Sequence, residues 1–170
     1  MNTKKNLVLL GMMGVGKTTI GKIVAKKLKI NFFDIDWLVE KKNEMKINEI
    51  FRIKGEAYFR KDEEFTTLKY LAKKGAIISL GGGAFINDKI RKKVLSDCIS
   101  IWLNTGLEKL QKRLINSNKR PLIQNNNQRD LNKLFFERKK YYSLANHEIN
   151  CDNLSPILVT KKIIELYEKI

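Results

Sequence analysis

The clearest chemical signal in this chain is a glycine-rich run near its N-terminus, NLVLLGMMGVGKTT at residues 6–19. Gly11, Gly16, Lys17 and Thr18 complete the pattern G-x-x-x-x-G-K-[ST], in which backbone amides surround phosphate oxygens without side-chain obstruction. An apolar strand precedes the run and an amphipathic helix follows it, so the positive end of that helix faces the same anion. The run therefore predicts a phosphate-binding loop rather than a structural glycine turn.

The individual loop residues predict contacts with a nucleoside triphosphate. The Lys17 ammonium can reach the β- and γ-phosphates, and the Thr18 hydroxyl can join the coordination shell of Mg²⁺. The chain is therefore expected to be a phosphotransferase that uses ATP as co-substrate and Mg²⁺ as cofactor. The ATP-binding residues expected in this run are Gly14, Val15, Gly16, Lys17, Thr18 and Thr19.

Two carboxylates stand two residues apart at the carboxyl end of the next predicted strand, residues 31–35. Ligands of open α/β sheets bind outside these strand ends. Asp34 could therefore hold Mg²⁺, directly or through water, beside Thr18. Asp36 could face the acceptor and take up its hydroxyl proton. The alternative is that Asp36 caps the helix starting at Trp37, and the two roles can coexist.

A second glycine cluster, residues 81–83, directly follows a predicted strand at 76–80. Three successive glycines cost conformational entropy, which favours close approach of a ligand to the backbone over a simple loop. Arg60 lies on a predicted helix with Glu63 and Glu64 three and four residues later, on the same face. The sequence leaves open whether this arginine makes an ordinary surface salt bridge or grips a substrate carboxylate.

Three further arginines lie around a polar segment, residues 116–128, which is the best candidate for a mobile loop. Arg120 lies inside this segment, and on a closing lid of about residues 112–126 it could neutralise charge developing on the transferred phosphoryl group. Arg113 lies on the helix leading into the segment, and Arg138 on the helix after it. For an arbitrary arginine, a solvated surface position is the better expectation.

The elements that must position these residues alternate between strands and helices. Such alternation predicts a parallel sheet covered on both faces, and the crossover rule makes it a three-layer α/β/α domain. Gly55 is expected to separate two helices. The expected strands cover residues 6–10, 31–35, 76–80, 99–103 and 148–151, and the expected helices cover 17–28, 37–43, 47–53, 56–73, 88–95, 107–114, 131–145 and a final stretch from 156.

Length and composition favour one compact domain, residues 1–170, because 170 residues with 43% hydrophobic side chains build one proper core and barely two. No apolar run approaches the ~20 residues that a membrane-spanning helix requires. The lysines near the N-terminus imitate a signal peptide weakly, but Gly11 and the later glycines interrupt the apolar stretch. Cys98 and Cys151 are too few for a disulfide-stapled secreted domain, which predicts a cytoplasmic protein with reduced thiols.

The formal net charge of +16 at pH 7 has two functional interpretations besides compositional bias. Nucleic acid would be attracted to such a surface, and so would a small polyanion such as ATP. The lysines are spread along every segment, and no aromatic stacking motif accompanies them. We therefore expect bias together with substrate steering, and no nucleic-acid partner. The alternative is a nucleic-acid-binding protein that keeps the phosphate loop as a relic.

Taken together, these residues resemble shikimate kinase, a small nucleoside-monophosphate-kinase-like enzyme, over essentially the whole chain. The phosphate loop is shared by a vast superfamily, so the later motifs carry the specificity. The resemblance rests on GMMGVGKTT at 11–19, FDID at 33–36, GEAYFR at 55–60, SLGGG at 79–83, KRPL at 119–122 and ER at 137–138. It implies transfer of the ATP γ-phosphate to the 3-hydroxyl of shikimate, in the route to chorismate and the aromatic amino acids.

The resemblance also implies roles by position. Lys17, Asp36 and Arg120 would be the catalytic residues, with Asp36 as the base in contact with the acceptor hydroxyls. Asp34 would help to hold Mg²⁺ through water. Arg120 would bind the phosphates, and Arg113 would lie near the adenine. The shikimate carboxylate would be bound by Arg60 and Arg138. Backbone contacts with the acceptor would come from Gly82 and Gly83.

The nearest alternative is another small-molecule kinase of the same fold, such as a gluconate or nucleotide kinase. SLGGG and GEAYFR fit shikimate kinase better than gluconate kinase, and a nucleotide kinase should bring a base-recognition pocket that the sequence does not indicate. Small kinases of this type are usually monomers, and a monomer that binds only small molecules and no membrane is the expectation here.

Overall fold

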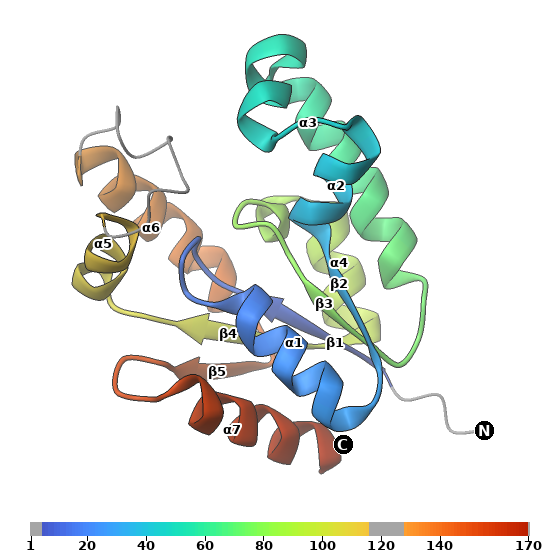
Figure 1. Ribbon diagram of the computed structural model, residues 1–170, viewed down its shortest axis with the longest axis vertical. Coiled ribbons are helices and arrows are strands. Elements are labelled where there is room, and N and C mark those ends of the chain that lie inside the picture. Colours follow the sequence, from blue (N-terminus) through green and yellow to red (C-terminus); the bar gives the residue numbers. More distant parts are fainter. Residues whose placement is uncertain (1–4, 116–127, 170) are drawn as a thin grey trace.

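A five-stranded parallel sheet forms the centre of the computed structural model, which describes residues 5–115 and 128–169 (Figure 1). The strand order is β2-β3-β1-β4-β5. Every neighbouring pair is parallel, so all strands end at the same edge. The strands are β1 (Asn6–Leu10), β2 (Asn31–Asp34), β3 (Ala76–Ser79), β4 (Cys98–Asn104) and β5 (His147–Asn150).

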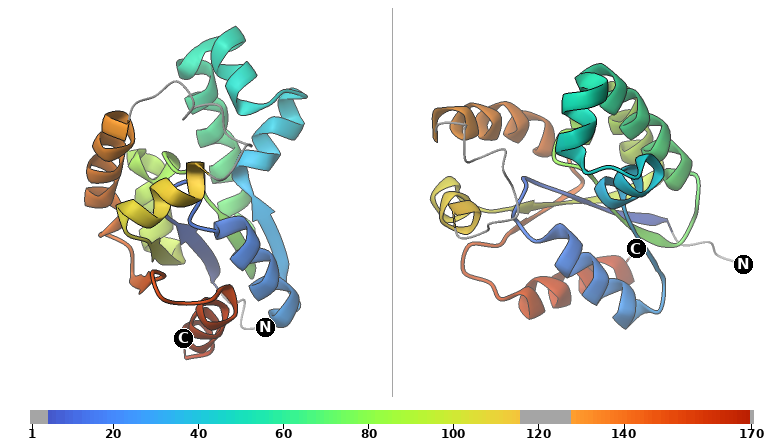
Figure 2. Two further views of the ribbon diagram at one scale, coloured as in Figure 1. Left: turned by 60° about the vertical axis from the view of Figure 1, so that its left-hand side comes forward. Right: turned by 45° about the horizontal axis from the view of Figure 1, so that its top comes forward.

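Helices cover both faces of this sheet. On one face α1 and α7 lie side by side, and on the other α4 packs with the later part of α3 (Figure 2). The predicted three-layer α/β/α architecture is therefore confirmed. The helices are α1 (Lys17–Leu28), α2 (Ile35–Asn43), α3 (Ile47–Leu71), the 3₁₀ turn η1 (Ala84–Ile86), α4 (Asp88–Asp97), α5 (Leu107–Ile115), α6 (Gln128–Tyr142) and α7 (Pro156–Glu168).

The core follows from this double coverage. All five residues of β1 and all four of β3 are buried, so these strands consist of continuous runs rather than of alternating apolar and polar residues. The one polar residue of β1, Asn6, is paired: its amide donates to Leu71 O at 3.0 Å, and its oxygen accepts from Ala76 N at 3.0 Å. The core thereby holds the strand that leads into the phosphate-binding run. Within the described ranges, no helix has both the length and the hydropathy needed to cross a bilayer.

Several element boundaries differ from those predicted. The predicted break at Gly55 is confirmed, although the helices expected at 47–53 and 56–73 are joined across it into one element, α3; the φ of 83° at Gly55 is one that only glycine adopts easily. Helix α6 begins at Gln128 and ends at Tyr142, whereas residues 131–145 were expected. The turn η1 was not predicted. Residues 116–127, most of the expected lid, lie outside the described residues, so the lid stays a prediction.

Candidate active site

The residues predicted to do chemistry converge because they follow neighbouring strands at the same edge of the sheet. The phosphate-binding run follows β1, Asp34 ends β2, and the glycine triplet follows β3. Figure 1 shows α2 and α3 on one side of this edge and α5 and α6 on the other. The central strands thus carry the backbone of the site, and the helix pairs flank it.

The phosphate-binding run forms an open turn ahead of α1. Gly11 has φ 141°, and a Cβ there would lie 2.6 Å from the backbone oxygen of Leu103, so only glycine fits. Gly16 occupies the cap position of α1 at φ 102°, and the first turn of that helix holds no acidic residue. The Lys17 ammonium lies across the loop and donates to Gly11 O at 2.7 Å and to Met12 O at 3.0 Å. The positive end of α1 therefore points at the space that the loop surrounds.

Thr18 and Asp34 lie next to each other at the mouth of this loop. The Thr18 hydroxyl donates to Asp34 Oδ2 at 2.5 Å, while Asp34 Oδ1 accepts from the Trp37 amide at 3.3 Å. Asp34 is thus the cap of α2, so the alternative that Asp36 caps this helix was wrong. The strand ends one residue earlier than predicted and the helix begins two residues earlier, at Ile35, so the cap is Asp34 and not Asp36.

Four charged side chains gather over the backbone of residues 81–83. A Cβ built on Gly81 would lie 2.5 Å from Asp36 Oδ1 and 2.6 Å from Glu63 Oε1. A Cβ on Gly82 would lie 2.9 Å from Arg138 Nη1, and one on Gly83 would lie 2.7 Å from Arg60 Nη1. The triplet is therefore glycine because charged groups from α2, α3 and α6 approach the backbone there.

Arg60 is held from two sides. Its Nη1 donates to Glu63 Oε2 at 2.8 Å, and the guanidinium pairs with Glu56 at 3.2 Å. The side chain of Glu63 is only 4% exposed, so this pair is not an ordinary surface salt bridge. Burial by itself lowers the pKa of Arg60, but the charge and hydrogen bond of Glu63 outweigh it and raise the pKa. Arg60 consequently stays protonated, and its two carboxylate partners hold the guanidinium in one position.

Glu63 is the electrostatic partner of both Arg60 and Asp36. Burial raises the pKa of its carboxyl, the neighbouring Arg60 opposes that rise, and the negative charge of Asp36 adds to it. From the sequence, Glu63 was expected only as a partner of Arg60. The i, i+3 spacing indicated that pair, but not the approach of Asp36, which comes from another helix.

Arg138 is a buried cation that uses only part of its hydrogen-bonding capacity within the described residues. It is 8% exposed, and its Nε and Nη1 have no acceptor in the part of the chain that the structure describes. Burying guanidinium donors without acceptors is costly. The position is therefore suited to an anionic ligand that supplies those acceptors.

Tyr142, which had no predicted role, lies one turn after Arg138 on α6. Its hydroxyl donates to the backbone oxygen of Gly82. Burial raises the pKa of Tyr142 to about 12, so the hydroxyl stays protonated and remains a donor. Tyr142 thereby fixes the middle of the glycine triplet against α6. The i, i+4 spacing from Arg138 was the one signal that could have indicated a shared face.

Helix α5 packs directly on the phosphate-binding run. Arg113 Nη1 lies 3.5 Å from Val15 O, and a Cβ on Gly14 would lie 3.0 Å from Leu114 Cδ2. Arg113 is thus beside the loop. Arg120 lies outside the described residues, and its role stays a prediction.

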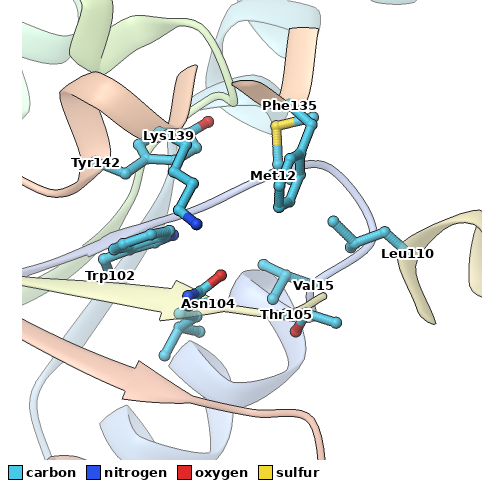
Figure 3. Close-up of a pocket in the computed structure, with 10 residues that line it drawn as sticks. Met12, Val15, Trp102, Asn104, Thr105, Leu110, Phe135, Lys139 and Tyr142 are labelled. Atoms are coloured by element: carbon cyan, nitrogen blue, oxygen red, sulfur yellow. The ribbon is translucent and has the colours of Figure 1, made fainter. Parts of the chain in front are cut away.

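A small cavity of about 10 Å³ lies between the loop, the end of β4 and α6, with Lys139 reaching toward Trp102 (Figure 3). It has room for one water molecule and not for a substrate. Its lining residues show that it is a gap in the packing between the phosphate-binding loop and α6, the helix that carries Arg138. The lining residues are Met12, Val15, Trp102, Leu103, Asn104, Thr105, Leu110, Phe135, Lys139 and Tyr142.

Known proteins are similar to this chain in both sequence and structure. A family model described as shikimate kinase matches residues 13–168. The chain belongs to the shikimate kinase family. The shikimate kinase of Bacillus subtilis is 44% identical over 166 residues, which cover 95% of this chain and 88% of that protein.

Solved structures of shikimate kinases superpose closely on this chain. The shikimate kinase of Acinetobacter baumannii in complex with shikimate has a TM-score of 0.91 at 30% identity, covering 98% of this chain and 94% of that chain. The shikimate kinase of Aquifex aeolicus has a TM-score of 0.84 at 32% identity over 96% of each chain. These comparisons confirm the predicted resemblance to the shikimate kinase family and the predicted class of enzyme, a phosphotransferase.

Proposed function

We propose that this chain transfers the γ-phosphate of ATP to the 3-hydroxyl of shikimate, giving shikimate 3-phosphate and ADP. The step would serve the route to chorismate and the aromatic amino acids. The observation that carries the proposal is the buried Arg138 guanidinium, whose Nε and Nη1 have no acceptor among the described residues although it faces the glycine triplet beside Arg60. A substrate carboxylate would supply the missing acceptors.

The acceptor would lie over residues 81–83. Arg60 and Arg138 would bind its carboxylate, because guanidinium forks pair with carboxylate oxygens in a way that lysine ammonium groups do not. Gly82 and Gly83 would add backbone contacts. Two arginines for a carboxylate, together with backbone groups for hydroxyls, fit an acceptor that carries one carboxylate and several hydroxyls.

Asp36 would act as the base. Its carboxylate lies over Gly81, next to the position proposed for the acceptor. In the transfer, the acceptor oxygen forms a bond to the γ-phosphorus, and the bond from that phosphorus to the oxygen bridging to the β-phosphate breaks. ADP leaves with that oxygen, and the hydroxyl proton passes to Asp36.

ATP would occupy the phosphate-binding loop, with the amides of residues 14–19 on its phosphates and Lys17 on the β- and γ-phosphates. Arg113, beside Val15, would lie toward the adenine. Thr18 and Asp34 fit Mg²⁺, since adjacent hydroxyl and carboxylate oxygens are the ligands that this ion prefers, Asp34 acting through water. When bound, Mg²⁺ would neutralise charge on the phosphate oxygens.

Several features of the proposal rest on the sequence and the family. Arg120 would reach the phosphates from a lid of about residues 112–126, and the chain would act as a single domain of residues 1–170. We also propose a monomer in the cytoplasm, where the two buried free thiols, Cys98 and Cys151, would stay reduced.

A panel of acceptors tests the proposal. The purified protein is incubated with ATP, Mg²⁺ and, separately, shikimate, gluconate and nucleoside monophosphates, and ADP release is measured. We expect turnover with shikimate at a kcat/KM at least a hundredfold above the other acceptors. Phosphorylation of gluconate or a nucleotide without shikimate turnover would refute the substrate, and no turnover combined with tight, salt-dependent oligonucleotide binding would refute the enzyme.

A further inference from the structure

Helices α2 and α3 together carry three of the charged residues at the glycine triplet. Asp36 lies in the first turn of α2, and Arg60 and Glu63 lie on α3. The placement of α2 against α3 therefore sets the distance between the proposed base and the proposed carboxylate-binding arginine. Helix α2 is short: it has nine residues, of which Ile35 and Val39 are buried, it follows an edge strand, and it packs mainly against α3.

A buried carboxylate on α3, Asp62, binds the far end of α2. Asp62 is 7% exposed. Its Oδ1 forms an ion pair with Lys42, and its Oδ2 accepts from Asn43 Nδ2 at 2.7 Å. A buried carboxylate is costly unless it is paired, and here both oxygens are used by the last turn of α2. Since Asp36 lies in the first turn of the same short helix, a contact at one end orients the other.

The Asn43 amide makes this contact a junction of three chain segments. Its Nδ2 also donates to Val39 O at 2.9 Å, and its Oδ1 accepts from Lys54 Nζ at 3.0 Å and from Tyr58 OH at 2.9 Å. Lys54 and Tyr58 stand on opposite sides of the kink at Gly55. One side-chain amide thus joins α2 to both parts of α3.

We propose that Asp62 is a positioning residue for the acceptor site: through Lys42 and Asn43 it holds α2 against α3 and so sets Asp36 relative to Arg60. The inference rests on the proposed function, because it concerns transfer to a carboxylate-bearing acceptor. Asp62 itself faces α2, whereas the next residue, Glu63, faces the glycine triplet. A misplacement on the order of 1 Å between reacting groups can cost about a hundredfold in rate, so loosening α2 has a measurable effect.

The chain offers a matched control on the same helix. Glu64 accepts hydrogen bonds from Lys89 Nζ at 2.9 Å and from Asn87 Nδ2 at 2.7 Å. It therefore has the same types of partner as Asp62, one lysine and one asparagine, but joins α3 to α4 instead of α2. The variants to compare are Asp62→Ala, Asp62→Asn and Glu64→Gln. Helix α2 keeps a second connection to α3 in Asp62→Ala, because Glu40 accepts from Lys46 Nζ at 2.9 Å and from Ile47 N at 3.1 Å.

Steady-state kinetics with ATP and shikimate give the first readout. In Asp62→Ala we expect kcat/KM for shikimate to fall about tenfold or more while the KM for ATP stays within twofold, because Asp62 binds the last turn of α2, whereas the phosphate-binding loop lies ahead of α1. Asp62→Asn, which keeps one acceptor oxygen, should lose less, and Glu64→Gln should match the wild type. An unchanged shikimate kcat/KM in Asp62→Ala, an equal rise in the KM for ATP, or an equal loss in Glu64→Gln would overturn the positioning role.

Amide hydrogen exchange of residues 37–43 gives a readout that needs no activity. We expect faster exchange in Asp62→Ala than in the wild type and in Glu64→Gln, and equal exchange in all three would overturn the inference. The two proposals fail separately. A wild type that does not phosphorylate shikimate refutes the proposed function. If the wild type is active and Asp62→Ala has the same kcat/KM for shikimate and the same hydrogen exchange, only the inference is refuted.

Discussion

Replacement of Arg138 by methionine should change stability and function in opposite directions. The guanidinium is 8% exposed, and two of its nitrogens have no acceptor among the described residues. An unsatisfied buried donor costs about 1–3 kcal/mol. Methionine fills much of the same volume without donors, so the free energy of unfolding of the ligand-free protein should rise by about 1 kcal/mol or more. For a domain of this size that corresponds to a rise in Tm of about 2–4 °C.

The same substitution should nearly abolish acceptor binding. Hydrogen bonds to a charged group contribute about 1.5–3 kcal/mol each, so losing a forked pair of two such bonds corresponds to a rise in the shikimate KM of at least about a hundredfold. Thermal unfolding without ligand and initial rates at varied shikimate measure the two effects. The KM for ATP should stay unchanged, since the phosphate-binding loop is intact.

Arg91→Met is the matched stability control. The side chain of Arg91 is also mostly buried, at 16% exposed, but it donates to Ile86 O at 2.8 Å and to Asp88 Oδ1 at 2.7 Å, so its loss should lower Tm. If Arg138→Met lowers Tm as much as Arg91→Met does and leaves the shikimate KM unchanged, Arg138 is a structural residue and the argument from its unused donors is refuted.

Three further predictions concern the phosphate loop, the base and Glu63. Lys17→Ala should reduce kcat by at least about a hundredfold, measured as ADP release, because the loop loses its positive charge on the β- and γ-phosphates; near-normal turnover would exclude that role. Asp36→Ala should lose most turnover while nucleotide binding, followed by calorimetry, survives; wild-type activity would refute the assignment of the base. Burial raises the pKa of Glu63, so the folded state keeps this proton to a higher pH than the unfolded state does. The free energy of unfolding should therefore decline as pH rises above the ordinary glutamate value of 4.5, and Glu63→Gln should lack that part of the decline in urea titrations at several pH values. Parallel pH profiles of the two proteins would contradict the shift.

The sequence predicted the parts of this structure that local rules determine. The phosphate-binding run, the parallel sheet and the break at Gly55 each follow from glycine spacing, apolar runs or backbone restriction within a few residues. The alternative that Asp36 caps α2 was wrong because the helix begins at Ile35, two residues before the expected start, which changes the side chain that reaches the first free amides.

Contacts between distant segments could not be predicted in the same way. The glycine triplet indicated a close approach, but not that Asp36, Glu63, Arg60 and Arg138 are the groups that approach it. Tyr142 reaches Gly82 only because α6 packs beside the end of β3, and the pairing of Asp62 with α2 depends on the angle between two helices. Such contacts are set by tertiary packing, which no local pattern records.

The most direct test of the acceptor site compares shikimate with its neutral carboxamide as substrates of the wild-type protein. The amide keeps the ring and all hydroxyls and removes only the charge that Arg60 and Arg138 are proposed to bind. We predict that kcat/KM for the amide is lower than that for shikimate by at least about a hundredfold, and that the KM for ATP is unchanged. Equal kcat/KM for the two compounds would contradict a carboxylate bound between these arginines.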